Sequence, residues 1–387
     1  MFIAPPMPNG SWTPFPVAPN LEPVPAPARH PDTLRGEVMR PVPLAARLAV
    51  VGTALAAAVA ATVSGSSAAP APDRPAAAPA KPLAGLKVLM TNDDSAQGRD
   101  AGFGTDGKGL YELRRALCSA GADVLVVAPW SQQSGAGARM TPPGFNPVSF
   151  TVQAVTPPAA YAGDCATGST GGAVFGVCIA AAPCASGTPT ASPADTVNVA
   201  LSRFAATYWS GGPDLVVSGT NFGQNIGATL NHSGTVGAAV TAHEYGVPAI
   251  AFSAEVPRDL AQIPNVPFAA TADFGVRLIT ALRQRRALDR GLVLNVNHPF
   301  VGAGEKLGRP VLTDVGVSSD LGLTFLDEVP RTGGTYRLVP GAPATETRRN
   351  ADTTALAQNK IPISSLDGDW GRTTGRGKVA GVIAQLR

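Results

Sequence analysis

Side chains that carry oxygen follow three hydrophobic, strand-like runs of this sequence, close to where each run ends. The runs at residues 86–92, 123–129 and 214–220 are followed, in order, by Asp93 with Asp94, by Ser134, and by Asn221. Ligands of an open α/β sheet bind beyond the carboxyl ends of its strands, so we expect these four side chains to converge. Their oxygens suit a hard divalent cation, and a cation with free coordination positions suits phosphate chemistry. The pattern predicts a metal site, although adjacent aspartates alone would also fit a solvated turn.

A glycine-rich segment at 233–239, Ser-Gly-Thr-Val-Gly-Ala-Ala, opens a predicted helix and has the character of an anion site. The first N–H groups of a helix lack intrahelical partners, and the helix dipole favours negative charge there. The same pattern also fits a serine N-cap followed by small residues that pack tightly. A second glycine-rich loop, at 218–227, lacks the Gly-x-Gly-x-x-Gly spacing and the later acidic residue that binds a ribose. A dinucleotide-dependent enzyme is therefore disfavoured.

Alternating strand and helix patterns predict the elements that position these residues. Strands are expected at 88–91, 124–128, 215–218, 249–253 and 292–296, and helices at 109–120, 193–206, 234–245 and 269–284. Wholly apolar strands indicate burial on both faces, and strand–helix–strand units with short returns indicate a parallel sheet. The expected fold is α/β, with a Rossmann-like, three-layer parallel sheet over roughly 85–300 and a smaller β-rich extension.

Two further regions are predicted to be less regular. Residues 141–192 are rich in Pro, Gly, Ser and Thr and are expected to leave the core as a small β-rich lobe. Residues 300–387 are expected to hold short strands and a closing helix at Val379–Leu386.

The composition bounds the class of protein. The chain has 387 residues, of which 44% are hydrophobic and 15% charged, with a net charge of +3. A dedicated nucleic-acid surface would show clustered Lys and Arg, but the sequence has no block of five like charges. A nucleic-acid surface is therefore not predicted.

Four cysteines fit an oxidising compartment. Three of them, Cys165, Cys178 and Cys184, fall in the 141–192 segment, where we expect a disulfide to stabilise a loop that lacks its own core. Cys118 lies on a predicted helix and is expected to be a buried thiol. A zinc site is not predicted, because the cysteines have no C-x-x-C spacing and no histidine lies near them in the sequence.

The N-terminal region has the outline of a secretory signal. An apolar run at 48–63 follows Arg40 and Arg47 and precedes small residues, as in a signal peptide. We expect a disordered leader or mis-assigned start at 1–38, a signal peptide at 39–69 and a Pro/Ala-rich linker at 70–85. Export is thus predicted, to the exterior or to a periplasmic or cell-wall space, and an uncleaved membrane anchor is the alternative.

Four motifs, taken together and in order, resemble one family. They are Thr-Asn-Asp-Asp at 91–94, Val-Ala-Pro followed by Gln-Ser-Gly-Ala-Gly at 127–137, Pro-Asp-Leu-Val-Val-Ser-Gly-x-Asn at 213–221, and Ser-Gly-Thr-Val-Gly-Ala-Ala at 233–239. The set is similar to the SurE family of metal-dependent 5′/3′-nucleotidases and acid phosphatases. The resemblance covers about 86–370 and leaves 371–387 as a C-terminal segment.

The resemblance implies a Rossmann-like core, an extension used in subunit exchange, and a homodimer or homotetramer. It implies removal of phosphate from nucleoside monophosphates or other small phosphomonoesters with Mg²⁺ or Mn²⁺. Asp93, Asp94, Ser134 and Asn221 would be the metal ligands, with the two aspartates also catalytic. The phosphate-binding residues would be Asn225, Ser233, Gly234 and Thr235.

The sequence departs from the family pattern at places that concern substrate choice. The stretch after Asp94 is longer than usual and contains Asp100 and Asp106. His232 stands where relatives often have Tyr, so it is an auxiliary candidate: either a general acid for the leaving alkoxide or a residue that shapes the pocket.

The expected function is a phosphomonoester hydrolase outside the cytoplasm. The alternative is a catalytically inactive phosphate- or nucleotide-binding protein of the same fold, against which the complete ligand set argues. Whether Asp93 attacks the phosphorus or positions a water is left open by the residues.

Overall fold

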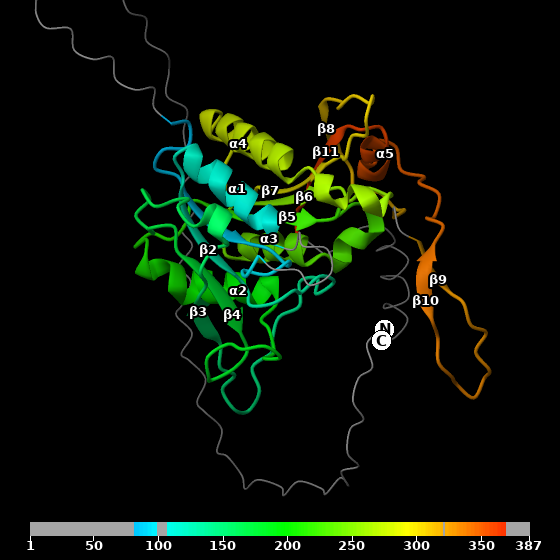
Figure 1. The fold of residues 1–387 in the computed structure, drawn as a ribbon, viewed down its shortest axis with the longest axis horizontal. Helices are drawn as coiled ribbons and strands as arrows, with labels where there is room; N and C mark the ends of the chain where they lie inside the picture. Colours follow the sequence, from blue (N-terminus) through cyan, green and yellow to red (C-terminus); the bar gives the residue numbers. More distant parts are fainter. Residues whose placement is uncertain (1–80, 99–106, 320–321, 369–387) are drawn as a thin grey trace, which may run out of the picture. The chain divides into compact units, whose positions relative to one another are not determined.

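A computed structural model of the chain describes residues 81–98, 107–319 and 322–368 (Figure 1). These residues belong to one compact unit, Pro75–Arg387. The predicted leader, signal peptide and closing helix, most of the predicted linker, and Asp100 and Asp106 lie outside the described residues. No helix in the described ranges is long and apolar enough to cross a membrane.

In these ranges nine strands form one sheet in the order β3-β4-β2-β1-β5-β6-β7-β11-β8. Their bounds are β1 (Lys87–Thr91), β2 (Asp123–Pro129), β3 (Thr151–Ala154), β4 (Val174–Cys178), β5 (Leu215–Phe222), β6 (Ala249–Ala254), β7 (Val293–His298), β8 (Pro310–Thr313) and β11 (Ile361–Ser365). The six strands from β4 to β7 pair in parallel, whereas β3 and β11 each run antiparallel to a neighbour at the two sides. The predicted parallel α/β sheet is confirmed.

Helices cover both faces of the sheet and complete three layers (Figure 1). On one face lie α1 (Lys108–Ser119) and α4 (Phe268–Gln284), and on the other α2 (Pro193–Val199) and α3 (Gly234–Glu244). Alternate residues of β1 enter different cores: Val88 and Met90 pack with the α1 side, and Leu89 packs with the α3 side. Because both faces are covered, the central strands are buried and mostly apolar, as the sequence pattern indicated.

Shorter elements follow the predicted pattern less closely. The predicted helix at 193–206 is observed as α2 continued by the π-helical η2 (Ala200–Phe204) and by η3 (Ala205–Thr207). The other short helices are η1 (Ala159–Tyr161), η4 (Gly227–His232), η5 (Leu260–Asn265) and α5 (Asp352–Ala357). A hairpin of β9 (Gly322–Phe325) and β10 (Leu338–Gly341) forms a separate two-stranded sheet that projects from the body (Figure 1). This hairpin is the smaller β-rich extension.

The 141–192 segment is not the separate lobe that the sequence suggested. Its strand β4 pairs in parallel with β2, and β3 pairs with β4, so both strands extend the main sheet. The physical reason is the free edge of β2, whose main-chain groups need partners. Val174 and Val177 of β4 are buried there.

The prediction that Cys118 is a free buried thiol was wrong. Disulfides join Cys118 to Cys165, with Cα atoms 5.1 Å apart, and Cys178 to Cys184. The second bond confirms a disulfide within the 141–192 segment. Cys118 was misassigned because its partner lies on a segment 47 residues away that folds back against α1.

Polar side chains of α1 hold that same segment in place. The buried Arg114 guanidinium donates to the main-chain oxygens of Asp164, at 3.0 Å, and of Gly172, at 2.6 Å. Burial lowers the pKa of Arg114 from its ordinary value. The Tyr161 hydroxyl donates to Glu112 on the same helix, at 2.7 Å. The segment is thus tied to the core through one helix face rather than through a core of its own.

Loss of the longer disulfide should cost more stability than loss of the shorter one. Closing a loop of 47 residues removes about 4 kcal/mol of denatured-state entropy, against about 2 kcal/mol for one of six. The Cys118→Ala/Cys165→Ala protein is therefore expected to unfold at a lower denaturant concentration than the Cys178→Ala/Cys184→Ala protein. Equilibrium unfolding by urea measures both, and the reverse order would contradict the prediction.

Candidate functional site

Three of the predicted motif segments are joined by main-chain hydrogen bonds beyond the ends of β1, β2 and β5. The Gln133 N–H, on the loop after β2, donates to the Asp93 carbonyl at 2.7 Å. On the same loop, the Gly137 N–H donates to the His232 carbonyl at 3.1 Å. The structure therefore brings together the aspartate turn, the loop that carries Ser134, and the entrance to α3.

Asp93 is held by the first turn of α3. Its carboxylate is 2% exposed and accepts from the Thr235 hydroxyl at 2.7 Å and from the Thr235 N–H at 3.1 Å. Burial raises the pKa of Asp93, against which the hydrogen bonds from Thr235 lower it. Both donors of Thr235 are engaged by this carboxylate, so its predicted contact with a phosphate stays a prediction.

Asp94 and Asn221 are brought together by the end of β5. The N–H of Phe222, the residue after Asn221, donates to Asp94 Oδ2 at 2.9 Å. Asn221 Nδ2 donates to the Gly223 carbonyl at 2.6 Å, and its Oδ1 is buried without a hydrogen-bond partner among the described residues. An unsatisfied buried oxygen costs about 1–3 kcal/mol, and a cation is one partner that would satisfy it.

Ser134 differs from the other predicted ligands because it is exposed. Its hydroxyl accepts from Gln132 Nε2 at 2.6 Å, and its N–H donates to Gln132 Oε1 at 3.1 Å. The loop that carries Ser134 is fixed to the aspartate turn, but its side chain is engaged by a neighbouring glutamine.

The donor set fits a hard divalent cation. It contains two buried carboxylates and the unpartnered amide oxygen of Asn221, all of them oxygen ligands. Within the described ranges, no three or more His, Cys, Asp or Glu side chains are grouped to hold a metal. Because all of the proposed donors are oxygens, they suit a hard cation better than a soft transition metal.

The predicted phosphate segment begins α3. Ser233 is the N-cap, and its hydroxyl oxygen accepts from the Val236 N–H at 3.1 Å, so the capping alternative is observed. The hydroxyl keeps a proton with which to donate to a ligand. A Cβ atom on Gly234 would lie 2.9 Å from both Cβ and Oδ2 of Asp93 and 3.0 Å from Cγ of Pro193. Only glycine allows α3 to approach the carboxylate this closely.

Asn225 is fixed by Asn295 and Asn297, to which the sequence analysis assigned no role. Its N–H donates to Asn297 Oδ1 at 2.7 Å, and its carbonyl accepts from Asn295 Nδ2 at 2.7 Å and Asn297 Nδ2 at 3.1 Å. Its own Nδ2 donates to Ser253 Oγ at 2.9 Å. Asn295 and Asn297 alternate with apolar residues in β7, so they share one face of the strand. The sequence did contain a signal for such a role, namely two asparagines at alternate positions of a strand that begins with apolar residues.

The histidines occupy different environments. His232 is exposed at the end of η4, and its carbonyl accepts from the loop that carries Ser134. His298 is buried, which lowers its pKa, and its Nδ1 lies 3.0 Å from the Pro299 carbonyl. Among the histidines in the part of the chain that the structure describes, His232 is the one that directly precedes the predicted phosphate segment.

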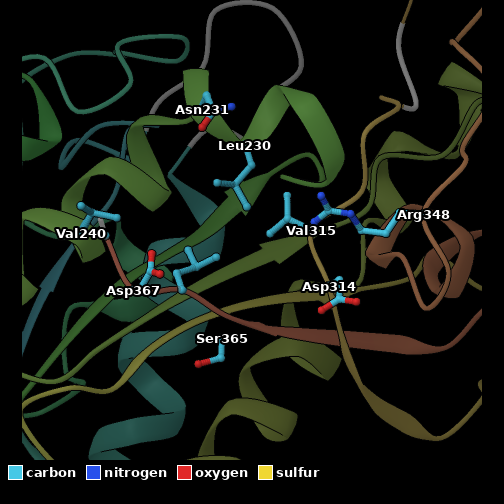
Figure 2. Close-up of a pocket in the computed structure, with 10 residues that line it drawn as sticks. Leu230, Asn231, Val240, Asp314, Val315, Arg348, Ser365 and Asp367 are labelled. Atoms are coloured by element: carbon cyan, nitrogen blue, oxygen red, sulfur yellow. The ribbon is translucent and has the colours of Figure 1, made fainter. Parts of the chain in front are cut away.

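A cavity of about 560 Å³ lies beside η4 (Figure 2). Leu230 and Asn231 of η4, Val240 of α3, and Asp314 and Arg348 from the C-terminal part of the chain contribute to its lining. None of the predicted metal or phosphate residues lines it. Those residues are mostly buried beyond the strand ends, so the cavity is a neighbour of the site.

Comparison with known proteins identifies similar chains. Residues 88–318 match the family model described as Survival protein SurE. A 5′-nucleotidase SurE from Desulfovibrio desulfuricans is 35% identical over 219 residues, which cover 55% of this chain and 66% of that protein. A 5′-nucleotidase SurE from Thermosynechococcus vestitus is 32% identical over 289 residues, which cover 73% and 91%. The crystal structure of the Sure protein from Aquifex aeolicus has the same fold, with a TM-score of 0.54, 21% identity, and coverage of 77% of this chain and 99% of that one.

Proposed function

The chain belongs to the SurE family, and from that premise we propose that it is a 5′-nucleotidase, a hydrolase that removes phosphate from nucleoside monophosphates. The observation that carries the proposal is the buried oxygen set of Asp93, Asp94 and Asn221, linked to the N-terminus of α3 through Thr235. Relatives named 5′-nucleotidase support the reaction class. The phosphate of a nucleoside monophosphate would then be held by two sources of positive charge. One is the cation bound by the carboxylates, and the other is the positive end of the α3 dipole.

Asp93, Asp94, Asn221 and Ser134 would hold the cation, for which Mg²⁺ or Mn²⁺ suits the oxygen donors. When bound, the cation supplies positive charge that offsets the charge of the phosphoryl oxygens. Thr235 keeps Asp93 in one orientation, because it donates to both carboxylate oxygens. The Ser233 hydroxyl at the start of α3 would donate to the phosphoryl oxygens, where negative charge develops in the transition state.

Hydrolysis of a phosphomonoester panel tests the function. Purified protein with Mg²⁺ or Mn²⁺ is expected to release phosphate from nucleoside 5′-monophosphates, and EDTA is expected to abolish the release. Nucleoside 3′-monophosphates and a small non-nucleotide ester define the substrate range. Binding of a nucleoside monophosphate without any phosphate release would support the inactive binding protein instead.

We also propose that the protein is exported. The signal-like segment at 39–69 and the two disulfides, which persist in oxidising compartments, support this location. The mature N-terminus should then lie between about Ala68 and Leu86, as N-terminal sequencing of secreted material would reveal. A cell-associated protein that keeps residues 48–63 would indicate the membrane anchor.

A homo-oligomer is the proposed assembly. Large apolar side chains are half-exposed or more along the β9–β10 hairpin: Leu323, Phe325, Leu326, Tyr336 and Leu338. Clustered exposed apolar side chains often mark protein contacts. Light scattering of the purified protein measures whether it is a dimer or a tetramer, and a monomer would contradict this assignment.

A further inference from the structure

The loop between β5 and α3 carries Asn225 and Ser233, two of the predicted phosphate residues, and it is anchored at two points. The first is Asn225, fixed by the asparagines of β7. The second is Gly227, two residues later, which is fixed by a part of the chain more than a hundred residues away. The first anchor orients Asn225 directly. The second lies at the start of the following turn, η4 (Gly227–His232), which leads to Ser233.

The second anchor is the carboxylate of Asp352, the first residue of α5. The Gly227 N–H donates to both of its oxygens at 3.1 Å, and the Gly316 N–H donates to Oδ1 at 2.8 Å. Asp352 is fully buried, and burial raises its pKa, against which these main-chain hydrogen bonds lower it. Its carboxylate therefore joins two separate loops and contacts none of the predicted metal or phosphate residues in the described hydrogen bonds.

A second carboxylate, that of Glu346, shapes the turn against which Gly227 packs. Its oxygens accept from the N–H groups of Val317 and Ser318, at 3.0 and 3.1 Å, and from the Thr353 hydroxyl at 2.8 Å. Although burial works in the opposite direction, these hydrogen bonds and one from Arg348 lower the pKa of Glu346 to about 2. The turn is thus held by an ionised side chain.

The turn and the phosphate loop are in close main-chain contact. The Ala228 N–H donates to the Ser318 carbonyl at 2.8 Å. A Cβ atom on Gly227 would lie 1.9 Å from that same carbonyl oxygen, and Gly227 has φ +55°. Glycine is required there, because a side chain would push the loop away from the turn.

We propose that Asp352 is a positioning residue for phosphate binding: it fixes the Gly227 main chain and so sets where η4 places Ser233. The inference rests on the proposed function for its ligand class, a phosphomonoester. It also predicts a selective effect. Asp93, Asp94 and Asn221 are held by β1, β5 and α3, so displacement of the Gly227 turn should weaken phosphate binding while cation binding is preserved.

Asp352→Asn is the test variant. Asparagine has the same shape, but its one carbonyl oxygen has two lone pairs for the three N–H groups of Gly227, Gly316 and Thr353 that donate to Asp352. Its NH2 group only donates, so the Gly227 N–H loses the acceptor that Oδ2 provides. Calorimetry of the Mn²⁺-loaded protein is expected to show about tenfold weaker binding of inorganic phosphate, with Mn²⁺ affinity unchanged. KM for a nucleoside 5′-monophosphate should rise by a similar factor and kcat should fall less.

Two further variants control the experiment. Asp314→Asn removes the same charge from an exposed position directly after β8. This variant should leave the phosphate affinity, the Mn²⁺ affinity and KM unchanged. Glu346→Gln, at a partly exposed position, should weaken phosphate binding in the same selective way and serves if Asp352→Asn fails to fold.

The outcomes separate this inference from the proposed function. Unchanged phosphate affinity and KM in a folded Asp352→Asn or Glu346→Gln protein would overturn the positioning role. Equal weakening of phosphate and Mn²⁺ binding would also overturn it, since that indicates a general loss of structure. If the wild type releases no phosphate from any ester but the variant binds phosphate selectively worse, the proposed function fails and the positioning role stands.

Discussion

Asp94→Asn is expected to lower phosphate release from a nucleoside 5′-monophosphate about a thousandfold while the protein stays folded. Asparagine keeps the shape and one oxygen, so the Phe222 N–H, 2.9 Å from Oδ2 in the wild type, still has an acceptor within reach. What is lost is one negative charge among the proposed cation ligands. Charge stabilisation by a cation contributes several kcal/mol, and each 1.36 kcal/mol corresponds to about a tenfold change in rate.

Metal binding is the second measurement for this variant. A cation that binds only the folded state raises the unfolding temperature, so Mn²⁺ should stabilise the wild type and stabilise Asp94→Asn much less. Asp273→Asn, an equal charge change at an exposed position of α4, should respond to Mn²⁺ as the wild type does. Full turnover by Asp94→Asn, or by the wild type in EDTA, would refute the assignment of these ligands.

The sequence was sufficient for the central sheet because local signals and global burial agree there. Strands such as Val124–Ala128 are apolar without interruption, and the helix at α1 shows apolar positions at Leu110, Leu113 and Leu117. Such patterns depend only on neighbours in the chain. The strand-end argument has the same basis, since a parallel sheet brings the carboxyl ends of its strands to one edge, where Asp93, Asp94 and Asn221 lie. Their role as metal ligands stays a prediction.

The sequence was insufficient where a residue is defined by a distant partner. Cys118 has the local environment of a buried helix residue, and only the return of the 159–172 segment reveals its disulfide. Asp352 likewise looks like an ordinary first residue of a short helix, although it hydrogen-bonds to Gly227, 125 residues earlier. Contacts of this kind arise from packing of separate elements, which no local periodicity records.

Thr235 illustrates a third situation, in which the residue was found but its contact was not. The motif predicted a phosphate donor, and the structure gives its hydroxyl and N–H to Asp93. The first turn of α3 therefore has two tasks: it holds the carboxylate of Asp93 through Thr235, and it leaves the proton of the Ser233 hydroxyl for an anion. Gly234 lies between Ser233 and Thr235, and it must be small so that this turn can approach Asp93 closely.

Gly234→Ala is expected to lower kcat/KM by about a hundredfold or more, although alanine favours a helix over glycine by about 1 kcal/mol. The added methyl group would lie 2.9 Å from Cβ and Oδ2 of Asp93, closer than carbon and oxygen atoms can pack, so either the aspartate or the start of α3 must move. Either movement displaces Asp93, a proposed cation ligand, relative to Ser233, whose hydroxyl is the proposed phosphate donor. The control is Gly211→Ala, where a Cβ atom meets nothing within 4 Å, so activity should be unchanged. Steady-state kinetics together with thermal unfolding decide the matter: a Gly234→Ala protein that is folded and as active as the wild type would show that the close approach of α3 to Asp93 is dispensable for catalysis.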